Sequence, residues 1–306
     1  MRNGYACFLC GSHEYAPVYE STFAGDYQPA HVAITDNAYG LTGRVVRCAG
    51  CEMITVYPRP SEDELVGLYS QLVDPRYQEE EAGRRDSFRR TLRAAQRLGA
   101  PNTRVFDIGA STGVFIDEAR RAGFDATGIE PSSWAVKMAK ERFGHDVIEG
   151  VLPHAGAERS AYGMATMLDV IEHVDDPRQL TLDAAELLAD GGLLVVTTPD
   201  YDSFISKRLK QKWWHCRLAH VQYFTPATLR RLLEACGFRV ERVARFGWTF
   251  SLLYWMSRLE RKQPVAALIR LLQSNGAGRF LLNRRVRINF RDSMTFFARL
   301  ERRVSP

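Results

Sequence analysis

The chain has 306 residues, of which 45% are hydrophobic and 25% are charged, a composition that is typical of globular proteins and excludes a disordered chain. No apolar stretch approaches the ~20 residues needed to cross a bilayer, and the first residues contain no apolar leader, so we expect a cytoplasmic protein. The net charge of +5 is unevenly distributed, because residues 207–306 carry 22 Lys and Arg against 5 Asp and Glu, whereas residues 1–206 carry 19 against 31. Such a basic third indicates an anionic partner, and it also fits a solvated surface that the acidic remainder balances.

Four cysteines form two closely spaced pairs near the N-terminus. Cys7 and Cys10 make the first C-x2-C pair, and Cys48 and Cys51 make the second. Each pair can place two thiolates at one tight turn, and two such turns supply the four sulfur ligands of a tetrahedral Zn²⁺ site. Because four thiolates leave no open position, we expect a structural zinc site in a zinc-ribbon-like module over residues 1–60. The alternatives are disulfides, which a cytoplasmic location disfavours, and unrelated free cysteines.

Residues 61–100 are expected to form a helical linker or lid. The sequence from Ser61 to Glu64 has the spacing of a capping box, which predicts that a helix begins there. A second, charged helix is predicted over residues 79–98 and ends at Gly99.

From residue 101 to 306 the sequence predicts one α/β domain. Short apolar strands alternate with helices that end at glycine, and this spacing implies a mostly parallel sheet with helices on both faces. Ligands of such sheets bind beyond the carboxyl ends of the strands. The strands are predicted at residues 104–108, 126–130, 147–148, 163–169, 193–198, 238–246 and 293–300, with a mostly helical insertion at about 250–285 between the last two.

The turn between the first strand and the first helix of this domain has the features of a cofactor-binding loop. Asp107 precedes the turn, and Gly109 and Gly113 allow the backbone to turn tightly and to approach a ligand closely. The helix that follows presents free N–H groups to a negatively charged group. Glu130 ends the next strand, where a carboxylate can accept both hydroxyls of a ribose. The loop alone fits a dinucleotide as well as an adenosyl cofactor.

These segments resemble the class I S-adenosylmethionine-dependent methyltransferases. The resemblance begins with Asp-Ile-Gly-Ala-Ser-Thr-Gly at residues 107–113, where Ser111 replaces the usual middle glycine, and continues with Gly-Ile-Glu-Pro at 128–131. The stretch Asp-Val-Ile-Glu-His-Val-Asp-Asp-Pro at 169–177 is similar to the branch that contains the ubiquinone-biosynthesis O-methyltransferases. The cysteine pairs resemble the zinc module of sugar C-methyltransferases. The resemblance implies a Rossmann-like sheet of seven strands, the last antiparallel, with S-adenosylmethionine as cofactor.

The resemblance also implies roles for individual residues. The loop from Gly109 to Gly113 would hold the amino-acid end of the cofactor, and Glu130 would hold the ribose. Residues after the third strand would lie along the adenine, a leucine at the end of the fourth strand would line the methionine, and a tyrosine of the preceding helical segment would cover the cofactor. The implied cofactor-binding residues are Tyr77, Asp107, Gly109, Ser111, Gly113, Glu130, Val151, Leu152 and Leu168.

Methyl transfer to a hydroxyl needs a group that removes or weakens the acceptor proton. Asp169, Glu172 and His173 can gather at the end of the fourth strand, and the resemblance implies a second, divalent-metal site for Mg²⁺, Mn²⁺ or Zn²⁺ at this set. We favour His173 as a general base, because one imidazole with two carboxylates does not define a metal site. The alternative is that Glu172 and His173 only brace the turn. His220 is a second candidate for a base or a substrate contact, with packing of its loop as the alternative.

The segment around His220 follows the fifth strand and should fold over the acceptor. Trp213 and Trp214 can form an apolar wall or stack on a ring, and Tyr223 is expected to contact the substrate, whereas His215 is expected at the surface. The insertion at 250–285 presents an apolar face among arginines. It fits either a lid packed on its own core or a basic amphipathic surface for a lipid, a membrane face or a carrier protein.

The sequence therefore predicts a small-molecule methyltransferase, most simply an O-methyltransferase, whose acceptor is anionic or linked to a lipid, carrier or nucleotide, such as a sugar or natural-product intermediate. The alternative is an RNA methyltransferase that binds nucleic acid through the zinc module and the basic third. The first 60 residues hold only four arginines and no lysine, which disfavours nucleic acid as a partner. A cofactor-binding scaffold without catalysis is the third interpretation.

Overall fold

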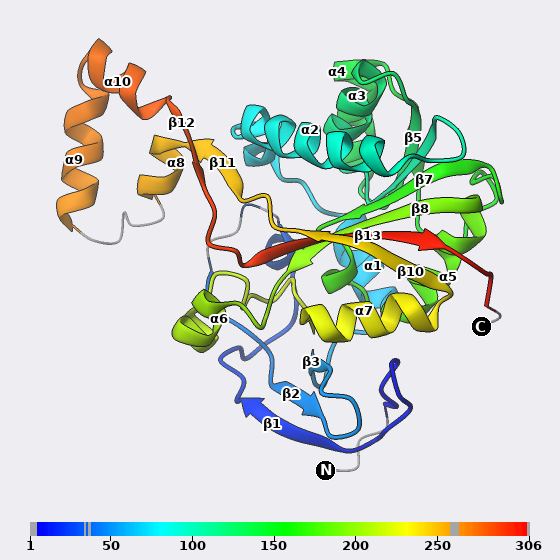
Figure 1. Cartoon of the computed structure of the whole chain (residues 1–306). Helices are drawn as coiled ribbons and strands as arrows, with labels where there is room; N and C mark the ends of the chain where they lie inside the picture. Colours follow the sequence, from blue (N-terminus) through cyan, green and yellow to red (C-terminus); the bar gives the residue numbers. More distant parts are fainter. Residues whose placement is uncertain (1–4, 34, 36–37, 258–262, 305–306) are drawn as a thin grey trace.

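Short apolar strands pair into one central sheet in the computed structural model, which describes residues 5–33, 35, 38–257 and 263–304 (Figure 1). The seven strands are β4 (Arg104–Ile108), β5 (Asp125–Glu130), β6 (Ile148–Glu149), β7 (Tyr162–Leu168), β8 (Leu188–Pro199), β10 (Phe238–Ala244) and β13 (Ser293–Leu300). Their order is β10-β13-β8-β7-β4-β5-β6, and β13 runs antiparallel to both of its neighbours. This arrangement confirms the predicted Rossmann-like sheet with an antiparallel last strand.

Helices cover both faces of the sheet. Successive residues of a strand point to opposite faces, so a strand that is apolar throughout has side chains to bury on both. On β4, Val105 packs with one layer of helices, and Phe106 packs with the other. The first layer contains α2 (Glu81–Leu98), α3 (Val114–Arg121) and α4 (Ser133–Phe143), and the second contains α5 (Pro177–Leu187) and α7 (Pro226–Ala235). The sheet core therefore lies between two helical layers, and the carboxyl ends of the parallel strands stay free for a ligand.

Several helices begin at residues whose side chains cap the first helical turn. The Ser61 hydroxyl accepts the Glu64 N–H at the start of α1 (Glu62–Ser70), which confirms the predicted capping box. Asp176 accepts two N–H groups of α5, and Thr225 accepts one of α7. These local hydrogen bonds explain why the helix boundaries could be predicted closely.

The N-terminal region shares a sheet with the main domain. Three strands, β1 (Tyr15–Tyr19), β2 (Val45–Cys48) and β3 (Ile54–Val56), are joined by the short strand β9 (Gln222–Tyr223) in the order β1-β2-β3-β9. Beyond this pairing, the Val56 N–H and the Thr55 hydroxyl both donate to the Val221 carbonyl, at 2.9 and 3.0 Å. The cysteine-bearing region is thereby tied to the loop that carries His220.

The insertion between β10 and β13 projects away from the sheet (Figure 1). It contains the predicted helices and, in addition, a two-stranded antiparallel sheet. One strand of this sheet precedes the helices in the chain, and the other follows them. Its elements are β11 (Trp248–Ser251), α8 (Leu252–Ser257), α9 (Gln263–Gln273), α10 (Gly276–Leu282) and β12 (Arg285–Ile288).

The remaining elements are short. They are α6 (Phe204–Leu209) and the 3-10 turns η1 (Pro29–Val32), η2 (Pro75–Gln78), η3 (Ile171–His173) and η4 (Lys210–Lys212). Among the described residues, none of the helices has the length and apolar character needed to span a membrane.

Candidate functional site

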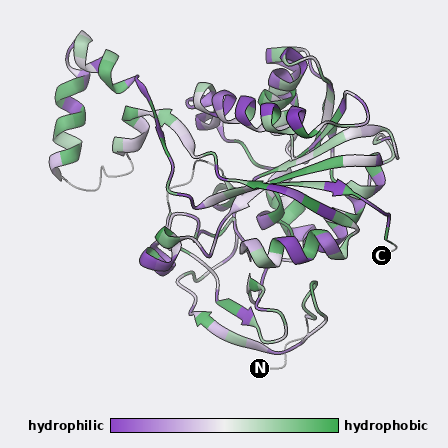
Figure 2. Cartoon of the chain, in the orientation of Figure 1, coloured by the Kyte–Doolittle hydropathy of each residue, from purple (hydrophilic) through white to green (hydrophobic). Residues whose placement is uncertain are grey.

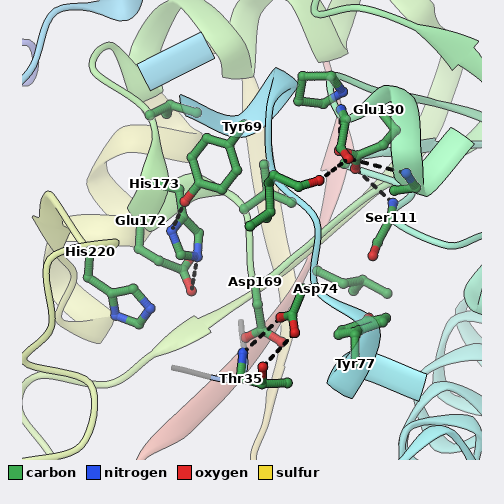
Figure 3. A pocket seen from close by; sticks show the side chains of 18 of the residues that line it. Thr35, Tyr69, Asp74, Tyr77, Ser111, Glu130, Asp169, Glu172, His173 and His220 are labelled. Atoms are coloured by element: carbon green, nitrogen blue, oxygen red, sulfur yellow. Dashed lines mark hydrogen bonds and ion pairs between the residues drawn. The ribbon is translucent and has the colours of Figure 1, made fainter. Parts of the chain in front are cut away.

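A cavity of about 1070 Å³ opens at the carboxyl ends of β4, β5 and β7. Single small-molecule pockets commonly measure ~300–1000 Å³, so this cavity has room for a cofactor together with an acceptor. Figure 3 shows Glu130 and Ser111 on one side of it and Glu172, His173 and His220 on the other. The predicted site residues that line it are Tyr77, Gly109, Ser111, Glu130, Val151, Leu152, Leu168, Asp169, Glu172, His173, Trp214 and His220.

The loop after β4 turns sharply and approaches its neighbours closely. Gly109 has a φ of 75°, and a Cβ atom there would lie 2.6 Å from Val170 Cγ2. Gly113 has a φ of 77°, and its Cβ would lie 2.9 Å from Ala139 Cβ. Both positions therefore require glycine. Ser111 also has a positive φ, 46°, which costs a residue with a side chain ~1–2 kcal/mol.

The Glu130 carboxylate holds this loop in place. Its Oε2 accepts the Ser111 N–H at 2.8 Å, and its Oε1 accepts the Ser132 N–H at 2.9 Å at the start of α4. Burial raises the pKa of Glu130, and the two N–H donors counteract this by stabilising the charged form. Each oxygen keeps a further lone pair, so the carboxylate can also accept hydroxyl groups of a ligand.

Two predicted cofactor residues shape the loop without lining the cavity. Asp107 is buried, accepts the Thr166 hydroxyl at 2.5 Å, and has a pKa that burial raises to about 7. Gly113 lies at the start of α3, behind the cavity wall.

His173 lies on η3, in the turn that follows β7, and its ring is held from one side. Its Nδ1 lies 2.7 Å from the Ala219 carbonyl oxygen. The same Nδ1 lies 2.7 Å from the Tyr69 hydroxyl (Figure 3). Because a carbonyl oxygen only accepts, Nδ1 carries the proton, and Nε2 is the nitrogen with a free lone pair. This Nε2 lies 3.9 Å from Glu172 Oε1. The backbone of the loop before β9 thus selects the tautomer.

The electrostatics of this corner keep His173 neutral. Burial lowers the pKa of His173 to about 4, the nearby positive charge of Arg217 acts in the same direction, and the Ala219 carbonyl opposes both. Burial, together with the charge of Asp169, raises the pKa of Glu172. At neutral pH the imidazole is in the form that accepts a proton.

Glu172, His173 and His220 form a close cluster. Their ligand atoms lie within 4.8 Å of one another, which is compatible with a shared metal ion. Within the described part of the chain, His220 takes the place in this cluster that the sequence interpretation gave to Asp169. Glu172 Oε1 and His220 Nδ1 are buried without a hydrogen-bond partner in the structure. Such unsatisfied atoms are costly unless a ligand, water or proton-sharing partner occupies the space between them.

The aromatic wall differs from the expected one. Trp214 lines the cavity, but Trp213 is fully buried behind it, where its indole N–H donates to Asp292 Oδ2 at 3.2 Å. Tyr223 lies in β9 and packs in the same core as Trp213, so it does not line the cavity. The surface position expected for His215 is wrong, since this residue lines the cavity and stacks on His220 at 5.6 Å between ring centroids. The buried Asp292 accounts for the inward position of the Trp213 indole.

Several cavity residues were not found from the sequence. Tyr69 and Arg217 lie beside His173, and four of the aromatic residues come from the insertion. The spacing of Leu65 and Tyr69, four residues apart on one helical face, was the available signal for Tyr69. The insertion's aromatic lining residues are Trp248, Phe250, Tyr254 and Trp255, joined by Phe290 after β12.

The four cysteines converge as their spacing predicts. The Sγ atoms of Cys7 and Cys51 lie 3.5 Å apart, as do those of Cys10 and Cys48, and all four lie within 4.8 Å of one another. A tetrahedral ion with Zn–S bonds of ~2.3 Å places its sulfur ligands about 3.8 Å apart, so the cluster fits zinc.

Comparison with known proteins places the chain in a family. The family described as "Methyltransferase domain" matches residues 77–243. A ubiquinone biosynthesis O-methyltransferase from Caulobacter sp. (strain K31) is 32% identical over 101 residues, which are 31% of this chain and 40% of that protein. The C-methyltransferase NovU from Streptomyces niveus is 26% identical over 203 residues, which are 64% of this chain and 46% of NovU. The chain thus spans less than half the length of these two curated relatives.

Among solved structures, a SAM-dependent methyltransferase from Archaeoglobus fulgidus aligns with a TM-score of 0.48 and 17% identity, over 74% of this chain and 100% of that one. Because the family match covers more than half of the sequence, the chain belongs to the methyltransferase-domain family, which confirms its resemblance to the class I S-adenosylmethionine-dependent methyltransferases.

Proposed function

We propose that the protein transfers the methyl group of S-adenosylmethionine to a hydroxyl of a small-molecule acceptor, with His173 as the general base. The observation that carries this proposal is the position of His173, whose Nδ1 lies 2.7 Å from the Ala219 carbonyl oxygen, a contact that favours the tautomer with a free lone pair at Nε2. An in-line transfer needs the acceptor proton to be removed at a defined atom, and Nε2 provides it.

We assign cofactor binding to the loop after β4 and to the residues around it. Glu130 accepts the ribose hydroxyls, the loop from Gly109 to Gly113 holds the amino-acid end, and Tyr77 covers the site from η2. Val151 and Leu152 line the adenine, and Leu168 lines the methionine. When bound, S-adenosylmethionine supplies an electrophilic methyl group, so the protein has to align the acceptor and handle its proton.

Glu172 is assigned to the proton transfer as a partner of His173. When Nε2 takes the hydroxyl proton, the imidazole becomes positively charged. Glu172 Oε1 lies 3.9 Å away and favours this charge in its ionised form, which burial and Asp169 oppose by raising the pKa of Glu172. A divalent ion shared by Glu172, His173 and His220 is the alternative use of the cluster. It would make the activity dependent on added Mg²⁺ or Mn²⁺, whereas a histidine base would not.

A carbon acceptor is the second candidate. The match to a C-methyltransferase extends over 64% of the chain, further than the match to the O-methyltransferase from Caulobacter. The same base at Nε2 serves this reaction, because a carbon acid also has to lose a proton before it is methylated. For either atom, the basic third of the chain favours an anionic acceptor or one linked to a lipid, carrier or nucleotide.

We further infer that Cys7, Cys10, Cys48 and Cys51 bind a structural Zn²⁺. The support is the convergence of four sulfur atoms at tetrahedral spacing. Because β3 pairs with β9, the ion stabilises the base of the loop that carries His220.

The test uses S-adenosylmethionine labelled in its methyl group, purified protein and an extract of the source cells. Label is counted in small-molecule, lipid, protein and RNA fractions. We expect label in the small-molecule or lipid fraction, and its chemical bond then distinguishes oxygen from carbon. Label confined to RNA or protein contradicts the proposal and favours the macromolecular alternative.

A further inference from the structure

The insertion forms an arm, defined here as β11, α8, α9, α10 and β12, that is anchored at its base. At its base, Thr249 Oγ1 donates to Asp86 Oδ2 at 2.8 Å, and Ser251 Oγ donates to Glu80 Oε1 at 2.6 Å, both on or beside α2. The two backbones also touch, since a Cβ atom at Gly83 would lie only 1.9 Å from the Thr249 carbonyl oxygen. The arm is therefore fixed to the sheet domain at one end and projects at the other (Figure 1).

The projecting end of the arm is unusually apolar for a solvent-exposed surface. Figure 2 colours most of α9 as hydrophobic, and Leu271 and Phe280 are 64% and 65% exposed. Leu268 and Leu281 are exposed as well. Six of the ten exposed large hydrophobic side chains in the described chain fall between residues 268 and 290. Such concentration marks an interaction surface rather than scattered surface residues.

The charge of the same segment is uniformly positive. Residues 263–291 contain no Asp or Glu. Every arginine of this range is exposed, and the set consists of Arg270, Arg279, Arg284, Arg285, Arg287 and Arg291. Pairing two such arms would bring like charges together, which disfavours a second copy of the chain as the occupant. Exposed apolar side chains among arginines match a surface that has an apolar interior and anionic headgroups.

We propose that the arm binds the surface of an anionic lipid bilayer. Leu268, Leu271 and Phe280 enter the boundary between headgroups and acyl chains, and the arginines bind the lipid phosphates, which guanidinium groups match geometrically. The arm lies on the membrane without crossing it.

The root of the arm connects this surface to the cavity. Trp248, Phe250 and Trp255 line the cavity and belong to the same insertion as the exposed leucines. A docked arm would hold the cavity mouth near the bilayer, where a lipid-linked acceptor is presented. This last consequence rests on the proposed function, whereas the binding of the arm to the bilayer does not.

The test is flotation of the full chain with vesicles of phosphatidylcholine mixed with phosphatidylglycerol, compared with vesicles of phosphatidylcholine alone. We expect binding to the anionic vesicles only, and weaker binding at high ionic strength. The variant Arg270→Gln/Arg279→Gln should lower the partition coefficient roughly 30-fold. The variant Leu271→Ser/Phe280→Ser should also lower binding, and its residual binding should be more sensitive to salt.

Matched controls make the same chemical changes outside the arm. Arg231→Gln/Arg302→Gln removes equal charge from exposed positions, and Phe204→Ser removes an 81% exposed phenylalanine from α6. The proposal is overturned if the wild type binds neutral and anionic vesicles equally. It is also overturned if the arm variants and the control variants lose vesicle binding to the same extent. A second copy of the chain is the occupant, and the proposal is overturned, if three results are found together. The wild type sediments as a dimer, Leu271→Ser/Phe280→Ser dissociates this dimer, and the wild type does not bind vesicles. Flotation needs no methyl acceptor, so its failure is separate from failure of the proposed activity.

Discussion

Glu130 joins the two backbone segments that frame the proposed ribose site, through the Ser111 and Ser132 N–H groups. Glu130→Ala should weaken binding of S-adenosylmethionine at least about tenfold, because hydrogen bonds to a charged group contribute ~1.5–3 kcal/mol each. Isothermal titration calorimetry measures this change, with Glu149→Ala at the exposed end of β6 as the control. Unchanged affinity in a folded Glu130→Ala variant would contradict the assignment.

The carboxyl group of Asp169, which lines the cavity, titrates near neutral pH. Burial raises the pKa of Asp169 to about 7, so its carboxyl group is neutral below that pH and ionised above it. A cofactor with a net positive charge favours the ionised form, so binding should release a proton, and affinity should rise with pH until about pH 7 and then level off. Titration calorimetry in buffers of different ionisation enthalpy measures the released proton. The same pH dependence in Asp169→Asn would show that another group causes it.

At this scale, the sequence allowed prediction of residues whose roles follow from their position along one strand–turn–helix unit. Glu130 and His173 are of this kind, because Glu130 ends β5 and His173 lies in the turn that follows β7. Tyr69 and Arg217 lie more than forty residues from His173 along the chain and reach it only through tertiary packing. Trp213 and His215 both approach the buried Asp292 Oδ2, at 3.2 and 3.8 Å, and no local pattern reveals that acceptor.

The cysteine-bearing sheet is the element that links the N-terminal region to the acceptor side of the cavity. Cys48 ends β2, β2 pairs with β3, and β3 pairs with β9 next to His220. Cys48→Ser should therefore lower the zinc content, the melting temperature and the methyl-transfer rate, while the affinity for S-adenosylmethionine changes less. Elemental analysis, thermal melts and calorimetry measure these quantities.

Cys236→Ser is the matched control, because this cysteine is buried at the C-terminal cap of α7 and is not part of the four-cysteine cluster. The account is contradicted when Cys48→Ser retains full zinc and full methyl transfer, or when it loses cofactor binding to the same extent as transfer.

The prediction of elements succeeded where periodicity and caps agree. Six of the seven sheet strands have five or more residues, and most helices between them are capped or end at glycine, so apolar runs and glycine stops locate them. The exception is β6, which has two residues. Strand β9 has two residues, and β11 and β12 have four each, which is too short for a periodic pattern. These three strands depend on partners that are distant in sequence, as in the pairing of β3 with β9.

In the whole molecule, three regions meet at one cavity. The sheet contributes Glu130, the turn after β7 contributes His173, and the root of the arm contributes an aromatic wall. The acidic first two thirds of the chain contain the proposed cofactor loop, and the basic last third contains the arm. The excess of positive charge is thereby concentrated in the part of the chain that carries the arm, and not in the part that carries the proposed cofactor loop.

The most direct test of the central claim measures cofactor binding and methyl transfer in parallel for the wild type and His173→Ala. His13→Ala, an exposed histidine in the N-terminal region, serves as the control. The account predicts that His173→Ala binds S-adenosylmethionine with nearly unchanged affinity and transfers its methyl group to the acceptor fraction ~10²–10⁴-fold more slowly, the usual contribution of a general base. Wild-type transfer by His173→Ala, or loss of transfer only in step with loss of cofactor binding, would contradict it.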